Sequence, residues 1–247
     1  IHGLDWQRAK WGGFATKFLK FGEKTAAKYA DELIVLSEGT RDYFKETYGR
    51  ETVFIPNGID VQNEKKADII TKKYGLEKDG YILFLARIVP EKGLHYLIDA
   101  FMQTDTDKKL VIAGGVSHSS EYAKQIHDMA KDDRIIFTGF VEGDELWELY
   151  YNCRMYVLPS DVEGMPISLL EAMACGCECL VSDIDTAKNV VGEYGYTFKK
   201  SDVNDLKNKL CEILVKPKAD KAEQIEYVKN NYSWDEITDR TLELYKK

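Results

Sequence analysis

The sequence has no long hydrophobic run and no excess of positive charge. None of its apolar stretches approaches the ~18 residues of a transmembrane helix, and its start shows no signal-peptide pattern. The net charge is -8 over 247 residues, which argues against nucleic acid as the main partner, because proteins of that class usually carry a basic field. These absences predict a cytoplasmic protein that does not bind nucleic acid.

Internal repeats, low-complexity tracts and a recognisable metal-binding pattern are absent as well. The five cysteines are an odd number, which favours free thiols in a reducing compartment over disulfides. Cys175, Cys177 and Cys179 alternate in CGCEC, but no second pair of Cys or His stands at a matching spacing. We therefore expect small core residues near a strand here, and no metal site.

Short apolar runs alternate regularly with helical stretches from residue 81 onward. This alternation predicts an α/β fold with a doubly wound parallel sheet, in which ligands bind at the carboxyl ends of the strands. The expected strands are 81–86, 110–113, 135–138, 155–158 and 179–182, and the expected helices are 93–102, 122–131, 142–151, 166–175, 203–214 and 221–245, the last with a break near Ser233-Trp234. Before this region, Ser37 is expected to cap a helix through Tyr48, which Gly49 ends.

The stretch from Met155 to Cys175 predicts a ligand site. A strand, a loop from Pro159 to Gly164 and a helix N-terminus form an anion site, because the first helical amides lack partners. Glu163 and Glu171 stand eight positions apart, which on a helix of ~100° per residue returns to nearly the same face. Carboxylates accept hydrogen bonds from vicinal hydroxyls. We therefore expect a ligand that is anionic in one part and polyhydroxylated in another.

Two cationic residues follow the strand at 81–86. Arg87 and Lys92 lie five positions apart in ARIVPEKG, just before a helix. A guanidinium can bind two phosphate oxygens, and a lysine adds a mobile point charge. Basic loop residues alone usually lie in solvent, but together with Glu163 and Glu171 they favour a diphosphate clamp.

The N-terminal segment combines aromatic and basic residues. They are Trp6, Arg8, Lys10, Trp11, Lys17 and Lys20. Such a segment can lie on anionic lipid headgroups as a peripheral contact. An ordinary helix packed on a domain surface is the alternative.

Three motifs together resemble the GT-B glycosyltransferases of family 4. They are ARIVPEKG, Pro56-Asn57-Gly58-Ile59-Asp60 and EGMPISLLEAMACG, which stand in the family's order and spacing across nearly the whole chain. The opening HGLDWQRAKWG further resembles bacterial members that build surface polysaccharides, often rhamnosyltransferase-like. The resemblance implies retaining, metal-independent transfer from a UDP-, GDP- or dTDP-linked sugar to a saccharide or lipid-linked acceptor, with no cofactor.

The resemblance also implies residue roles. Arg87 and Lys92 would neutralise the donor diphosphate, Glu171 would bind the ribose hydroxyls, and Glu163 the transferred sugar. Val141, in Gly139-Phe140-Val141, would border the nucleobase, and His2 would lie near the reacting sugar. The loop residues expected to line the donor site are Gly164, Met165, Pro166, Ile167 and Ser168, where Pro166 has no N–H to donate.

Three parts are expected on this resemblance. Residues 1–60 would be the last part of an acceptor-side Rossmann-like domain whose larger part precedes His2. Residues 61–215 would bind the donor, and residues 216–247 would form a helix that packs back toward the first domain. We expect the chain to bind a nucleotide sugar; whether it also transfers the sugar stays open.

Three other functions are possible interpretations of this sequence. One is a non-catalytic nucleotide-sugar-binding domain, and another is an epimerase or phosphorylase of the same architecture, which would need a different His or Lys constellation. A dinucleotide oxidoreductase is disfavoured, because Ala113-Gly114-Gly115-Val116-Ser117 lacks the GxGxxG spacing.

Overall fold

A six-stranded parallel sheet forms the centre of the computed structural model, which describes all residues except 2, 5, 7–11, 116–119 and 247. Its strand order is β5-β4-β3-β6-β7-β8, and every neighbouring pair is parallel. The strands are β3 (Tyr81–Leu85), β4 (Lys109–Ala113), β5 (Ile135–Gly139), β6 (Met155–Leu158), β7 (Cys179–Ser182) and β8 (Tyr196–Phe198). The order reverses between β3 and β6, so the chain has a switch point there.

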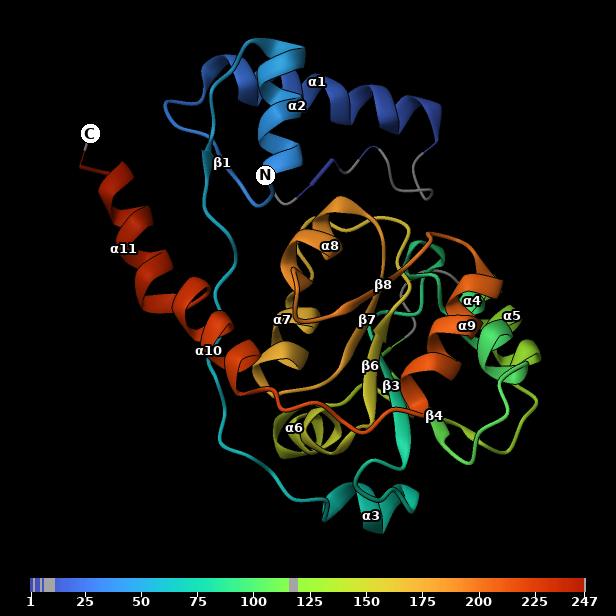
Figure 1. The fold of residues 1–247 in the computed structure, drawn as a ribbon. Coiled ribbons are helices and arrows are strands. Elements are labelled where there is room, and N and C mark those ends of the chain that lie inside the picture. The colour runs from blue at the N-terminus through green and yellow to red at the C-terminus, as the bar shows by residue number, and fades with distance from the viewer. Residues whose placement is uncertain (2, 5, 7–11, 116–119, 247) are drawn as a thin grey trace.

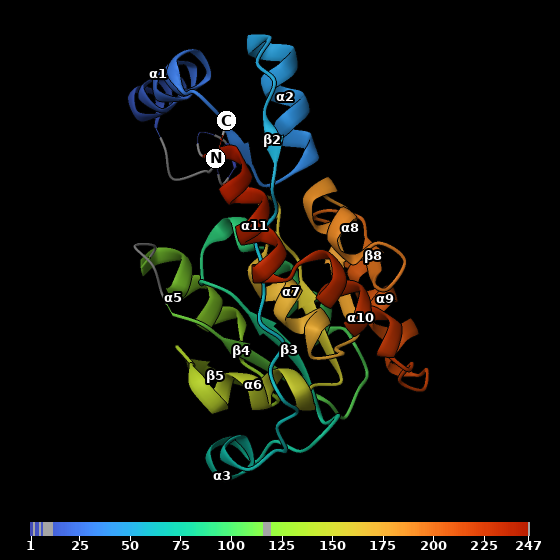
Figure 2. The same ribbon diagram turned by 90° about the vertical axis from the view of Figure 1, so that its left-hand side faces the viewer.

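Helices cover both faces of this sheet (Figures 1 and 2). Along β3, Tyr81 and Leu83 belong to one hydrophobic cluster, while Ile82 and Phe84 belong to the other, as the two-residue period of a strand requires. The first cluster includes α3 (Ile69–Tyr74), α6 (Gly143–Asn152), α7 (Ile167–Ala174), α8 (Asp185–Val191) and α10 (Ala222–Asn231); the second includes α4 (Leu94–Met102), α5 (Ser120–Met129) and α9 (Val203–Leu214).

A smaller unit lies at the top of Figure 1, formed by the first part of the chain. The strands β1 (Ile34–Val35) and β2 (Val53–Phe54) pair in parallel, and α1 (Gly13–Tyr29) and α2 (Glu38–Tyr48) pack beside them. The Ser37 side chain accepts a hydrogen bond from the Thr40 amide and caps α2, which ends at Gly49 in the left-handed conformation. The sequence predicted this helix and both of its ends.

The chain crosses between the two units twice. The first crossing follows β2 and descends to α3, and the second joins α10 to α11 (Trp234–Leu244) (Figure 1). The two crossings meet at Ile59, whose amide donates to the carbonyl of Tyr232 at 2.7 Å. The Arg240 guanidinium then donates to the carbonyl of Phe54 at 2.6 Å. The C-terminal helix is therefore bonded to the strand of the smaller unit.

The observed elements confirm most of the expected ones. The predicted break at Ser233-Trp234 separates α10 from α11. The strand β8 and the helix α8 were missed, because each is short and lies where the expected alternation had ended. The idea that Glu163 and Glu171 share a helix face is wrong, because α7 begins at Ile167 and Glu163 lies in the loop before it.

None of the helices within the described part of the chain is long and apolar enough to span a membrane.

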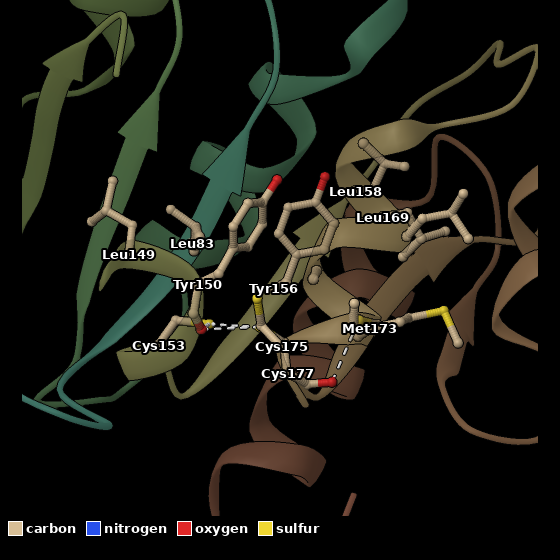
Figure 3. Close-up of a cluster of buried hydrophobic side chains, with 14 of the residues drawn as sticks. Leu83, Leu149, Tyr150, Cys153, Tyr156, Leu158, Leu169, Met173, Cys175 and Cys177 are labelled. Carbon is tan, nitrogen blue, oxygen red and sulfur yellow. Dashed lines mark hydrogen bonds between the residues drawn. The ribbon is translucent and has the colours of Figure 1, made fainter. Parts of the chain in front are cut away.

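The cysteines lie in or beside the core and have free thiols. Cys175, Cys177 and Cys179 are buried in the cluster of α6 and α7, as expected of small core residues. The Cys153 and Cys177 thiols are 3.6 Å apart, and each also donates to the carbonyl of Tyr150 (Figure 3). Burial raises the pKa of the Cys175 thiol to about 12, so this thiol stays protonated and unreactive at neutral pH.

Candidate functional site

The loops after β3 and β6 meet at the switch point of the sheet. The loop after β3 carries Arg87 and a 3₁₀ turn, η2 (Pro90–Lys92), and the loop after β6 carries Ser160 and Glu163. The Asp161 amide donates to the carbonyl of Glu91 at 2.9 Å and ties the two loops together. In open α/β sheets this crevice is the usual ligand site.

Gly93 permits the two loops to approach closely. Its φ of +66° is left-handed, and a Cβ there would overlap the carbonyl oxygen of Pro159. A side chain at residue 93 would therefore be strained by its own backbone and by the neighbouring loop. The glycine holds the turn that carries Lys92 against the loop that carries Glu163.

Lys92 and Glu163 form an ion pair between these loops. Lys92 Nζ lies 2.5 Å from Glu163 Oε1, and the two side chains are 16% and 6% exposed. The Ser160 hydroxyl donates to the same Oε1 at 2.6 Å, and the Ser182 hydroxyl donates to the carbonyl of Ser160. The Glu163 carboxylate is thus held by one cation and one buried hydroxyl.

A cavity of about 500 Å³ opens over this pair. Arg87, Lys92, Glu163 and Gly164 line it, so four of the predicted site residues share one hollow. Its other lining residues are Gly3, Leu4, Ser37, Gly39, Thr40, Glu91, Asp161, Val162, Ile184, Asp185, Thr186 and Lys200. The cavity lies between the six-stranded sheet and the smaller unit, and it contains cations, carboxylates and hydroxyls.

The N-terminal segment reaches the loop of Glu163. Gly3 lines the cavity, and a Cβ on it would lie 3.3 Å from the Cα of Gly164. His2, predicted to lie near the reacting sugar, is outside the described residues. Gly3, which follows His2 in the sequence, therefore lies against the loop that carries Glu163, the residue expected to bind the sugar.

Glu171 does not line this cavity. It lies on α7, where its Oε2 accepts a hydrogen bond of 2.8 Å from the Tyr150 hydroxyl. Burial raises the pKa of the Glu171 carboxyl, and the hydrogen bond from Tyr150 partly opposes this increase. Of the four polar groups expected to converge, Glu171 is the one set apart.

The remaining predicted residues lie around the start of α7 and the end of β5. Met165 lines a second cavity of about 170 Å³, together with Gly164, and its sulfur accepts from the Asn57 amide. Pro166 is the N-cap of α7, Ile167 is partly exposed, and Ser168 follows it in the first turn. Val141 is buried in the core, and Phe140 before it is exposed. Neither residue lines the larger cavity.

Known proteins share both the sequence pattern and the fold. Residues 66–232 match the family described as Glycosyl transferases group 1, and residues 1–60 match a Domain of unknown function (DUF1972). The chain belongs to the glycosyl transferases group 1 family. This membership goes against a dinucleotide oxidoreductase.

Two curated relatives of the family illustrate the range of similarity. The O-antigen chain mannosyltransferase B of Escherichia coli is 27% identical over 187 residues, which are 72% of this chain and 48% of that protein. The N,N'-diacetylbacillosaminyl-diphospho-undecaprenol alpha-1,3-N-acetylgalactosaminyltransferase of Campylobacter jejuni is 25% identical over 243 residues, 91% of this chain and 62% of that protein. The chain spans about half the length of the first of these relatives.

Solved structures of similar fold cover the whole chain. The sucrose-phosphate synthase of Thermosynechococcus elongatus superposes with a TM-score of 0.85 at 23% identity, over 100% of this chain and 66% of that one. Anabaena Alr3699/HepE in complex with UDP and glucose gives 0.86 at 20% identity, over 100% of this chain and 70% of that one. The expected GT-B-type α/β fold is confirmed.

Three residues in or beside the candidate site were not predicted from the sequence. Ser160 had a signal, since it lies two residues after the strand β6, in the loop that the sequence had indicated as part of a ligand site. Lys200 adds a third cation to the cavity, but it follows the missed strand β8. Tyr150 gave no signal, because an aromatic residue in an amphipathic helix is usually a core residue.

No group of three or more His, Cys, Asp or Glu side chains that could hold a metal ion occurs in the described part of the chain.

Proposed function

We propose that this chain binds a nucleotide sugar and serves in retaining, metal-independent glycosyl transfer to a saccharide or lipid-linked acceptor. The observation that carries the proposal is the cavity at the switch point, which Arg87, Lys92 and Glu163 line together. Two cations suit a diphosphate, and a carboxylate suits sugar hydroxyls. Membership in the glycosyl transferases group 1 family supports the same chemistry.

In this proposal the cations act on the leaving group. Negative charge grows on the diphosphate as the glycosidic bond breaks, and fixed positive groups stabilise it without a metal ion. Arg87 is exposed at the cavity, while Lys92 is held by Glu163. Glu163 would bind a hydroxyl of the transferred sugar, Glu171 the ribose, Val141 the rim of the base site, and His2 the reacting sugar.

The choice of acceptor and donor class is supported by the names of related proteins. The Campylobacter jejuni relative is named for a diphospho-undecaprenol acceptor, and the Escherichia coli relative for an O-antigen chain. The Anabaena structure is described in complex with UDP and glucose. We propose a UDP-, GDP- or dTDP-linked hexose or deoxyhexose as the donor.

We also propose a peripheral contact with the inner face of the membrane through α1. Phe14, Phe18 and Phe21 are 87%, 68% and 67% exposed on this helix, and spacings of four and three residues put them on one face. Lys17, Lys20, Lys24 and Lys28 are exposed beside them. Aromatic rings flanked by lysines suit the headgroup region of an anionic bilayer.

The single acid of α1 is turned away from this face. Glu23 accepts hydrogen bonds from Trp6 Nε1 and from the hydroxyls of Tyr43 and Tyr48. Trp6 is therefore directed inward and does not join the aromatic face, contrary to the expectation from the sequence. The other N-terminal residues of that expectation, Arg8, Lys10 and Trp11, lie outside the described residues.

Calorimetry with UDP, GDP and dTDP tests the donor site. We expect Arg87→Ala/Lys92→Ala to weaken the best of these ligands by ~3 kcal/mol, about a hundredfold, because two charge-assisted contacts are lost. Lys209→Ala/Lys216→Ala is the matched control, since it removes the same charge from α9 and the residues after it, where both lysines pair with Glu212. Equal affinity of the first variant and wild type would contradict the proposal.

The non-catalytic alternative differs in a second measurement. A transferase should release the nucleotide from the matching nucleotide sugar when a suitable acceptor is present, whereas a binding domain should hold it unchanged. Binding without release across a panel of saccharide and lipid-linked acceptors would favour the binding domain.

A further inference from the structure

Glu171 is held at one oxygen by a buried phenol. Tyr150 is 1% exposed, and its hydroxyl lies 2.8 Å from Glu171 Oε2 and 3.2 Å from the carbonyl oxygen of Ser168. A phenol has one proton to donate, and the carboxylate is the closer and more strongly charged acceptor. Among the hydrogen bonds of the described residues, Glu171 Oε1 has no partner.

The Tyr150 ring itself has little freedom to move. It lies in the core between Trp147 and Tyr156, with ring centroids 6.0 Å away in each case. Its backbone carbonyl accepts from the thiols of Cys153 and Cys177. A close-packed side chain with only two rotatable bonds places its hydroxyl at a fixed point.

Tyr156 provides a natural comparison in the same cluster. Its hydroxyl points in the same direction as that of Tyr150 (Figure 3), but it donates to Ser168 Oγ at 2.9 Å instead of to Glu171. Both phenols therefore bond to α7, and only Tyr150 bonds the carboxylate. Removing either hydroxyl deletes one buried polar atom, so the two changes are matched in size.

We propose that Tyr150 is a positioning residue for nucleoside binding, whose hydroxyl fixes one oxygen of Glu171 and leaves the other to accept from the ribose. This inference depends on the proposed function, because it assigns the ribose contact to Glu171. The phenol limits the rotamers of the carboxylate before the ligand arrives. It also favours the ionised form, which is the form that accepts two hydroxyl donors.

Among the groups around Glu171, the Tyr150 hydroxyl is the main one that opposes the effect of burial on the pKa of this carboxyl. Tyr150 on α6, Tyr156 on β6 and Cys175 at the end of α7 are neutral near pH 7, because burial raises the pKa of each. Glu163, in the loop before α7, is paired with Lys92. Among the described residues, no charged group on α8, α10 or β7 contributes to the shifted pKa of Glu171.

The test compares Tyr150→Phe with Tyr156→Phe by calorimetry between pH 5.5 and 8, with UDP, GDP and dTDP as probes. We expect Tyr150→Phe to weaken the best ligand about fivefold at pH 8 and by more at pH 5.5, because Glu171 is protonated more readily without the phenol. Tyr156→Phe should stay within about twofold of wild type at every pH. Ionisation of the nucleotide itself is common to all variants and cancels in each ratio.

Carboxyl carbon NMR of Glu171 gives a readout that needs no ligand. The pKa of Glu171 should rise in Tyr150→Phe and remain at the wild-type value in Tyr156→Phe. An unchanged pKa in Tyr150→Phe, or equal binding losses in both Phe variants, would overturn the role of Tyr150. Failure of all three nucleotides to bind wild type would instead defeat the proposed function, while the NMR titration would still decide what Tyr150 does to Glu171.

Discussion

Lys92 Nζ and Glu163 Oε1 lie 2.5 Å apart and join the loops that follow β3 and β6. The two residues had separate predicted roles, one with the diphosphate and one with the sugar. Their ion pair means that the charge available to a diphosphate depends on Glu163. A change at one residue should therefore alter the ligands assigned to the other.

Glu163→Gln should change the affinity for a nucleotide diphosphate and for its sugar conjugate by different amounts. The amide releases Lys92 from its ion pair, so the diphosphate should bind more tightly by ~1 kcal/mol, about fivefold. The nucleotide sugar should gain less or lose affinity, because the anionic acceptor for a sugar hydroxyl is gone. Calorimetry with both ligands measures this difference. An equal change in affinity for the two ligands would show that Glu163 does not take part in sugar recognition.

Glu171→Gln should stabilise the folded protein and weaken its binding of nucleotides. Burial raises the pKa of this carboxyl above 4.5 in the folded state, so the native protein binds the proton more tightly than the unfolded chain does. Stability from this group is therefore present at low pH and is lost as the pH rises through the raised pKa. We expect the Gln variant to melt at a higher temperature than wild type at pH 7.5, while it binds nucleotides more weakly.

The sign of this effect can be checked by its pH dependence. Calorimetric melting of both proteins between pH 4 and 8 should show the advantage of Gln shrinking as the pH falls, because Glu171 then becomes protonated and neutral. A constant difference across this range would mean that the charge of Glu171 has no part in it.

Gly93→Ala should destabilise the protein and disturb the site. The left-handed φ and the contact with Pro159 both oppose a side chain, and a loss of ~2 kcal/mol or more is expected. Gly22→Ala is the control, since this residue lies inside α1 and, beyond the backbone of its own helix and its chain neighbours, no atom lies within 4 Å of the added Cβ. It should gain up to about 1 kcal/mol from helix propensity. Urea unfolding measures both changes; similar stabilities would contradict the strain at Gly93.

Phe18→Ser/Phe21→Ser should weaken binding to vesicles that contain anionic lipid. Loss of two exposed rings from α1 should lower the bound fraction on the order of tenfold, since burial of apolar area contributes the non-electrostatic part. Binding of wild type should also fall as salt increases, because the lysines are screened. Val215→Ser, which changes an exposed apolar residue after α9, is the control. Equal co-sedimentation of all three proteins would rule out α1 as the contact.

Local patterns in the sequence predicted most of the fold. The helix from Ser37 to Gly49 was recognisable because its cap and its terminal glycine follow from residue chemistry alone. The strand β8 was not, because three residues at a sheet edge are too few to show a period. Their place is decided by pairing with β7, which is a tertiary interaction.

The site was predictable in part for the same reason. Arg87, Lys92 and Glu163 follow strands whose neighbours in the sheet could be anticipated, and they share the cavity. The separation of Glu171 and its bond to Tyr150 depend on the packing of α6 against α7. No spacing within one segment encodes that contact.

The meeting of Ile59 with Tyr232 restricts how the cavity can change its width. Both covalent connections between the smaller unit and the six-stranded sheet run through this point, where the amide of Ile59 is bonded to the carbonyl of Tyr232. A swing of one unit against the other therefore has its pivot beside these residues, and the width of the cavity changes with the angle at that pivot.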